Sequence, residues 1–248
     1  MQKKFDPFEG QKPLLIFIQT APWGMVIGAD TPNVALYEDG QVIFVRLVKR
    51  HYEYFQTQLD KPTLDQILQK LKAIGVVKGH YDIAPGVTDQ PEALFYWRMG
   101  TSTLATRVYG LTRSGRLSGP RTTMPGNKQA TPPPQELLNL HRWLCTLDFP
   151  HAKSWTSRYT EVMLGDFSSA RKSIPWPGSL PGLNSLQTIK RRDAYSIFLE
   201  PQQLPALEKL LSKLTERTAV ILSGKKFSLG TRKTFPCEPE WREAFKKL

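Results

Sequence analysis

The sequence predicts an α+β fold in which antiparallel β-hairpins form a sheet covered by about three amphipathic helices. Two strand-like runs, 33–37 and 41–46, are joined by Glu38-Asp39-Gly40, and a short Asp-Gly connection is a strong hairpin signal. A helix follows over 61–74, where Lys61-Pro62-Thr63 precedes apolar residues at helical spacing and Gly75 ends the pattern. A helix with one apolar stripe needs a sheet to cover that stripe.

The other elements of the first half are predicted in the same way. A strand over 14–19 precedes a turn at Ala21-Pro22-Trp23-Gly24, and an aromatic run follows the first hairpin at 51–55. Residues 79–89 are rich in turn formers and predict a loop. The runs 93–98 and 103–109 then predict a second hairpin, because Thr, Tyr, Phe and Trp favour strands.

The second half repeats the order of strand and Leu-rich helix. Its predicted helices are 135–147, 201–214 and a short C-terminal helix near Glu240 to Lys247, and its predicted strands are 194–199, 219–222 and 225–229. The breaker-rich stretch Gly165 to Leu186 is interpreted as a linker or a functional loop. We therefore expect two similar α+β halves, 1–130 and 131–248, or one continuous domain.

Composition places the chain among ordinary globular proteins. Its 248 residues are 40% hydrophobic and 23% charged, which is enough to bury a sizeable core. We find no signal peptide and no apolar run long enough to span a membrane. Cys145 and Cys237 are too few and too far apart for a disulfide framework or a zinc site, so we expect reduced thiols in a cytoplasm.

Net charge is the unusual feature of the composition. Thirty-four Lys and Arg residues against 22 Asp and Glu residues give a formal charge of +12, which favours acidic partners. No acidic residue occurs between Glu92 and Glu136, an interval that also carries six basic residues. A solvated surface is the ordinary explanation of such a run; a binding surface is the functional one.

Part of the first 110 residues resembles a group of poorly characterised bacterial proteins. The similarity rests on Ala29-Asp30-Thr31-Pro32, on 36–43 and on Val87-Thr88-Asp89-Gln90-Pro91 after a Leu-rich helix. Such proteins are often secreted or lipid-anchored, whereas no export segment is found here. The resemblance implies a hairpin-helix-hairpin layout and brings no catalytic residue.

No motif in the sequence predicts a particular reaction. The four His residues are scattered, so no metal site is predicted, and no cofactor is implied. Ser223-Gly224-Lys225-Lys226 matches only the middle of a P-loop, and a Gly-x-Ser-x-Gly elbow is absent. Glu161 and Asp166 are considered as a carboxylate pair for acid–base chemistry, but a solvated pair is far more common. The chain is therefore expected not to be an enzyme.

Binding residues are easier to nominate. Arg113, Arg116, Arg121 and Lys128 lie in a Gly- and Pro-rich segment without a local acid, and arginine suits bidentate contact with carboxylate or phosphate. Trp176 lies between Pro175 and Pro177, where it serves either as an interface anchor or as a plug over the core. These five residues form the predicted partner-binding set.

Two functions from different classes follow. The first is a non-catalytic cytoplasmic protein whose basic surface binds an acidic protein, in its sharpest form an immunity protein that neutralises a bacterial toxin. The second is a nucleic-acid-binding protein, for which the pI of 9.7 and Arg-rich loops with aromatic residues are suggestive, although no helix-turn-helix, RNP-like aromatic signature or zinc finger is found. An enzyme acting on an acidic substrate is a third alternative. No membrane partner is expected.

Overall fold

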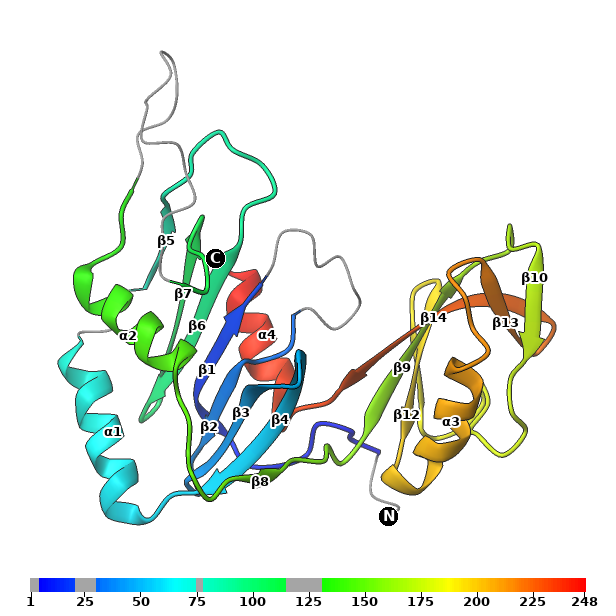
Figure 1. Cartoon of the computed structure of the whole chain (residues 1–248), viewed down its shortest axis with the longest axis horizontal. Helices are drawn as coiled ribbons and strands as arrows, with labels where there is room; N and C mark the ends of the chain where they lie inside the picture. Colours follow the sequence, from blue (N-terminus) through cyan, green and yellow to red (C-terminus); the bar gives the residue numbers. More distant parts are fainter. Residues whose placement is uncertain (1–4, 21–29, 75–77, 115–130) are drawn as a thin grey trace. The chain divides into compact units, whose positions relative to one another are not determined.

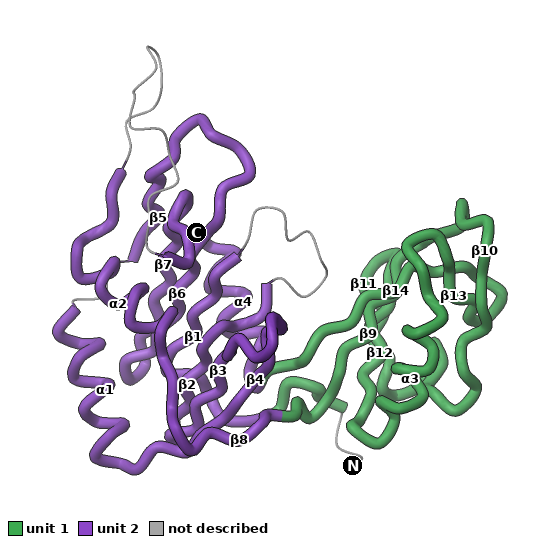
Figure 2. The backbone as a smooth tube through the Cα atoms, in the orientation of Figure 1, with its two compact units in different colours: residues 1–9, 26–28, 156–235 green, residues 10–25, 29–155, 236–248 purple. Residues whose placement is uncertain are grey.

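The computed structural model describes residues 5–20, 30–74, 78–114 and 131–248. These residues divide into two compact units, drawn in green and purple in Figure 2. The described part of the smaller unit is 5–9 and 156–235, and the described part of the larger unit is 10–20, 30–74, 78–114, 131–155 and 236–248. The division between residues 155 and 156 differs from the predicted one between 130 and 131, which falls inside the larger unit.

The larger unit is built on an eight-stranded sheet. Its strands, in spatial order, are β5 (Gly79–Asp82), β7 (Ser102–Tyr109), β6 (Glu92–Met99), β1 (Pro13–Gln19), β2 (Val34–Tyr37), β3 (Gln41–Val48), β4 (His51–Gln58) and β8 (Lys153–Ser154). All neighbours run antiparallel except β5 and β7, which are parallel. The central strand β1 pairs with β2 and with β6, which lies more than 70 residues further along the chain.

Three helices cover the two faces of this sheet (Figure 1). Leu15 and Phe17 of β1 belong to one core cluster with residues of α1 (Lys61–Ala73) and α2 (Gln135–Cys145). Side chains alternate between faces along a strand, so Tyr96 of β6, whose neighbours Phe95 and Trp97 lie in that cluster, points to the other face. There its hydroxyl donates a hydrogen bond to Glu240 of α4 (Glu238–Lys246), so α4 packs on the side opposite α1 and α2.

Local sequence signals account for the predicted hairpin and the helix after it. Gly40, between β2 and β3, has a φ of +86°, and a Cβ there would lie 2.8 Å from the Leu59 carbonyl oxygen, so glycine is required on both grounds. The Asp60 side chain caps α1 by accepting a hydrogen bond from the Thr63 amide at 2.9 Å, and Pro62 lies in the first turn. Both predicted elements are confirmed.

The smaller unit has a six-stranded sheet and the helix α3 (Leu204–Leu211), which follows the 3₁₀ turn η1 (Pro201–Gln203). The strand order is β10 (Lys172–Pro175), β13 (Thr218–Leu222), β14 (Lys225–Lys233), β9 (Thr160–Asp166), β12 (Ala194–Leu199) and β11 (Thr188–Arg191). Only β10 and β13 are parallel neighbours. Leu207 and Leu210 of α3 pack on Val162 and Ile197 of the sheet in a second core cluster.

The predicted fold class is wrong. Among the described residues, 39% lie in strands and 20% in helices, and the architecture is two mixed sheets of eight and six strands with four α-helices. The helices do not form one covering layer: α1 and α2 share one face of the larger sheet, α4 covers its other face, and α3 belongs to the smaller unit. The two units are not similar halves either, because their strand orders differ.

The error has a physical cause. Strands β5 and β10 lie in stretches that predict a loop or linker, since both stretches are rich in turn formers, and no strand is predicted for the segments of β8, β9 and β11. Such segments become strands when a long-range neighbour supplies their hydrogen bonds, as β14 does for β9 over seven residue pairs. None of the described helices combines the length and apolar character needed to cross a membrane.

Candidate functional site: a basic hairpin tip

Arg113 is the one residue of the predicted basic segment within the described part of the chain. Arg116, Arg121 and Lys128 lie in 115–130, outside the described residues. The guanidinium carbon of Arg113 lies 4.8 Å from the centroid of the Tyr52 ring, which is within the range of a cation–π contact. The fold thus brings Arg113 next to the tip of the β3–β4 hairpin.

Trp176 lies in the core of the smaller unit and not on an exposed surface. It is 8% exposed, packs in the core cluster of the smaller unit and donates its indole N–H to the Pro181 carbonyl oxygen at 3.1 Å. Pro175 ends β10, so the residue follows directly on an edge strand. This burial is that of a plug over the core and leaves little indole surface for a partner.

The hairpin tip, residues 47–52, presents an exposed apolar pair. Leu47 and Tyr52 are directly opposite in the β3–β4 ladder, so both side chains lie on the same face of the sheet. They are 59% and 60% exposed, and they are two of the five large hydrophobic residues exposed in the described chain. Tyr and Arg are both residue types that are enriched at protein-binding hot spots.

The turn that joins the two strands is strained. Lys49 and Arg50 connect Val48 to His51, and their φ angles are +47° and +71°. Positive φ at both central residues is the type I′ arrangement, which favours Asn-Gly and costs a residue with a Cβ about 1 kcal/mol. Two long cationic side chains therefore occupy positions where local stability would select other residues.

Cations outnumber carboxylates at the tip, where the exposed Glu53 directly follows Tyr52. None of Lys49, Arg50 and Arg113 forms an ion pair with a carboxylate of the described residues. Arg46, which directly precedes Leu47 in β3, is different. Its guanidinium group pairs with Asp148 and lies 4.4 Å from the centroid of the Phe55 ring. The tip thus carries three cations around an apolar pair, and we call Leu47, Lys49, Arg50, Tyr52 and Arg113 the tip surface.

The sequence carries one weak signal for this surface. The runs ending at Leu47 and beginning at His51 are separated by only a few residues, which is hairpin spacing. Because the connection lacks Asn, Asp, Gly or Pro, the usual turn chemistry did not mark it. The contact between Arg113 and Tyr52 joins residues 61 positions apart and has no local signal.

A second polar cluster lies inside the larger unit. The buried His141 Nε2 lies 2.7 Å from Gln19 Oε1 and 3.5 Å from Cys145 Sγ. The side-chain Nε2 of Gln19 donates hydrogen bonds to the Leu111 and Glu92 carbonyl oxygens at 2.9 and 3.2 Å, and these bonds orient Oε1 toward the imidazole. His141 Nε2 therefore carries the proton, and Nδ1 is buried with no hydrogen-bond partner in the part of the chain that the structure describes.

This cluster is not an activated thiol–imidazole pair. Burial lowers the pKa of His141 to about 4, with a smaller effect from Arg142, and burial raises the pKa of Cys145 to about 11. Both groups are neutral near pH 7, whereas a nucleophilic cysteine needs a stabilised thiolate. His141 and Gln19 instead join α2 to the end of β1.

Glu161 and Asp166 do not form a catalytic pair. They are five residues apart on β9 and so face opposite sides of the sheet. Glu161 is 1% exposed and pairs with Arg232 and, at 3.2 Å, with Arg191. Within the described ranges, no three His, Cys, Asp or Glu side chains gather as a metal site would require.

No family model, curated protein or solved structure matches this chain. Its function therefore has to be inferred from the geometry of its own residues.

Proposed function

We propose that the protein is a non-catalytic binding protein that docks onto an acidic protein partner through the tip surface. The observation that carries the proposal is the exposed Leu47–Tyr52 pair surrounded by Lys49, Arg50 and Arg113, cations without carboxylate partners among the described residues. Apolar contact supplies affinity at the centre of such a surface, and surrounding charge supplies orientation and a faster association rate.

The strain in the turn supports a binding role. A stability-driven sequence would place Asn-Gly between β3 and β4, so cations at these positions are more simply explained by a contact outside the chain. We further propose a cytoplasmic location, to which the two free cysteines are suited. The narrower form of the proposal is an immunity protein that blocks a bacterial toxin, and its support is the basic surface alone.

The test is capture of partners from a bacterial lysate with the tagged full chain. The tip variant replaces Lys49, Arg50 and Arg113 by Glu, which keeps side chains with a Cβ in the turn. The control variant replaces Lys209, Lys213 and Arg217 by Glu, an equal charge change at exposed positions of the smaller unit. We expect a stoichiometric protein partner that the wild type and the control retain and the tip variant loses.

Retention of that partner by the tip variant would contradict the proposal. For the purified pair, Tyr52→Ser should weaken binding by about 2 kcal/mol, close to thirtyfold in Kd, because Tyr52 provides the largest apolar contact. The immunity form additionally requires that the partner is toxic and that an equimolar amount of this protein, but not of the tip variant, abolishes its activity.

Nucleic-acid binding is the second candidate. An exposed aromatic ring next to cations also fits base stacking combined with phosphate contact. In that case nuclease treatment should remove everything captured, and log K should fall linearly with log salt, with a slope of about −0.7 per neutralised phosphate on single strands. A protein retained after nuclease treatment would exclude this candidate as the explanation of the capture.

A further inference from the structure

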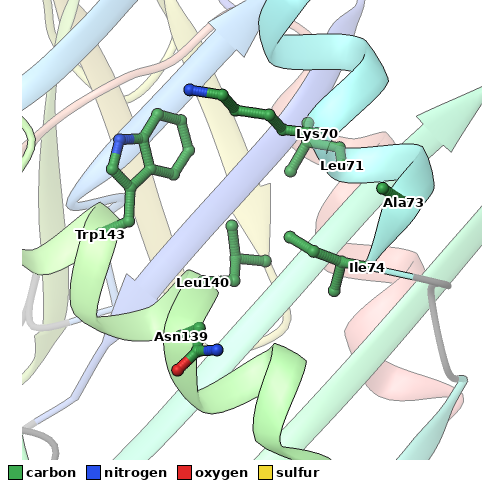
Figure 3. Close-up of a pocket in the computed structure, with 7 residues that line it drawn as sticks. All are labelled: Lys70, Leu71, Ala73, Ile74, Asn139, Leu140 and Trp143. Atoms are coloured by element: carbon green, nitrogen blue, oxygen red, sulfur yellow. The ribbon is translucent and has the colours of Figure 1, made fainter.

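A groove opens between the C-terminal part of α1 and the middle of α2 (Figure 3). Its volume is about 320 Å³, and its lining residues are Lys70, Leu71, Ala73, Ile74, Asn139, Leu140 and Trp143. The floor is apolar, since Leu71 and Leu140 are buried core residues of the larger unit. A volume of this size lies at the lower end of the range of small-molecule sites.

The polar groups of the groove lie at its two ends, Lys70 at one and Asn139 at the other (Figure 3). Lys70 forms no ion pair with a carboxylate in the described part of the chain. The Asn139 Oδ1 already accepts hydrogen bonds from Gln135 at 3.0 Å and Arg142 at 2.6 Å. One cation and one amide N–H₂ group therefore remain to contact a molecule in the groove.

We propose that this groove binds a small amphipathic carboxylate, with a compact apolar body between Ile74, Leu140 and Trp143 and its carboxylate at the Lys70 ammonium group. The polarity of α1 supports this orientation. The C-terminal carbonyl groups of the helix, around Ala73 and Ile74, repel an anion, whereas Lys70 attracts it. The indole of Trp143, only partly buried, offers the apolar body a large flat contact.

The probes are 4-phenylbutyrate and its neutral counterpart 4-phenylbutanol, titrated into the full chain and followed by NMR shifts of the Trp143 indole N–H. We expect the carboxylate to bind with a Kd of about 1 mM. The alcohol should bind about threefold to fivefold more weakly, because it lacks the charge contact with the exposed Lys70.

Three variants locate the site. Lys70→Met keeps the apolar stem and should remove the preference for the carboxylate, while Lys72→Met, on the same helix and outside the lining, should keep it. Ala73→Leu narrows the groove from an exposed position and should abolish binding of both probes. The far-UV circular dichroism of each variant shows whether α1 is intact.

The proposal would be overturned if neither probe binds at a concentration of about 10 mM, which is tenfold the Kd expected for the carboxylate. So would equal affinity for the two probes, or binding that Lys70→Met and Ala73→Leu leave unchanged. The groove shares no residue with the tip surface, so the two proposals fail independently: the tip variant should bind 4-phenylbutyrate normally, and Lys70→Met should retain the protein partner.

Discussion

His141 and Glu161 are buried ionisable residues whose surroundings treat charge in opposite ways. The His141 imidazole has Gln19 Oε1 and Cys145 Sγ within reach of Nε2 and no partner for Nδ1 among the described residues, so a second proton would have no acceptor there. The Glu161 carboxylate instead meets the guanidinium groups of Arg191 and Arg232. The first site excludes a charge, and the second balances one.

Protonation of His141 should make stability depend on pH. Its pKa is lowered to about 4 in the folded protein, against an ordinary value of 6.5, so the unfolded chain binds more protons between these pH values. The contribution of His141 is therefore complete above pH 6.5 and is lost as the pH falls toward 4, at up to about 1 kcal/mol per pH unit.

The measurement is urea unfolding of the wild type and His141→Gln at several pH values from 4 to 8. The difference in unfolding free energy between the two proteins should shrink as the pH falls below 6.5. A difference that stays constant over the whole range would show that the imidazole is not kept neutral by the fold.

The Glu161–Arg232 pair makes a separate prediction. Arg232→Met leaves the Glu161 carboxylate buried with one partner fewer, which should cost about 3–5 kcal/mol of unfolding free energy. Replacing both residues by Met should be less damaging than Arg232→Met alone, because no uncompensated charge is then buried. Chemical denaturation of the single and double variants gives the comparison; a double variant at least as unstable as Arg232→Met would contradict this account.

At the scale of an element, the β3–β4 hairpin should trade stability for binding. Lys49→Asn with Arg50→Gly places the favoured residues in the left-handed turn and should stabilise the larger unit by about 1 kcal/mol. The same change removes two cations of the tip surface and should weaken binding of the acidic partner. Thermal unfolding together with the capture assay tests both halves; a loss of stability would mean that the lysine and arginine side chains support the turn.

The whole molecule consists of two units with separate cores, and destabilisation should stay local. Trp241 of α4 is fully buried in the larger unit, so Trp241→Ala should cost about 3–5 kcal/mol there. Native-state hydrogen exchange should then lose protection in β1, β6 and β7, while β9, β12 and β14 keep theirs. Equal loss in both sets of strands would show that the units unfold together.

Only part of the candidate site could be predicted from the sequence. Arg113 was nominated from its charge, whereas Tyr52 and Leu47 were not, because their exposure depends on which face of the sheet the helices cover. Trp176 was ambiguous for the same reason: a Trp beside Pro has the same local pattern on a surface as in a core. The groove between α1 and α2 depends on how two helices 61 residues apart pack, which no local pattern contains.

The sequence alone determined the elements whose signals are local: the hairpin around Gly40, the capped helix α1, the hairpin of β6 and β7, and the basic character of the chain. Turn chemistry, capping and apolar periodicity act over a few residues, so they can be recognised there. Only the tertiary structure decided the two mixed sheets, the division of the helices among them and the exposed tip surface. Each depends on pairing or packing between distant residues, where burial and hydrogen bonds from a neighbouring strand override the local pattern.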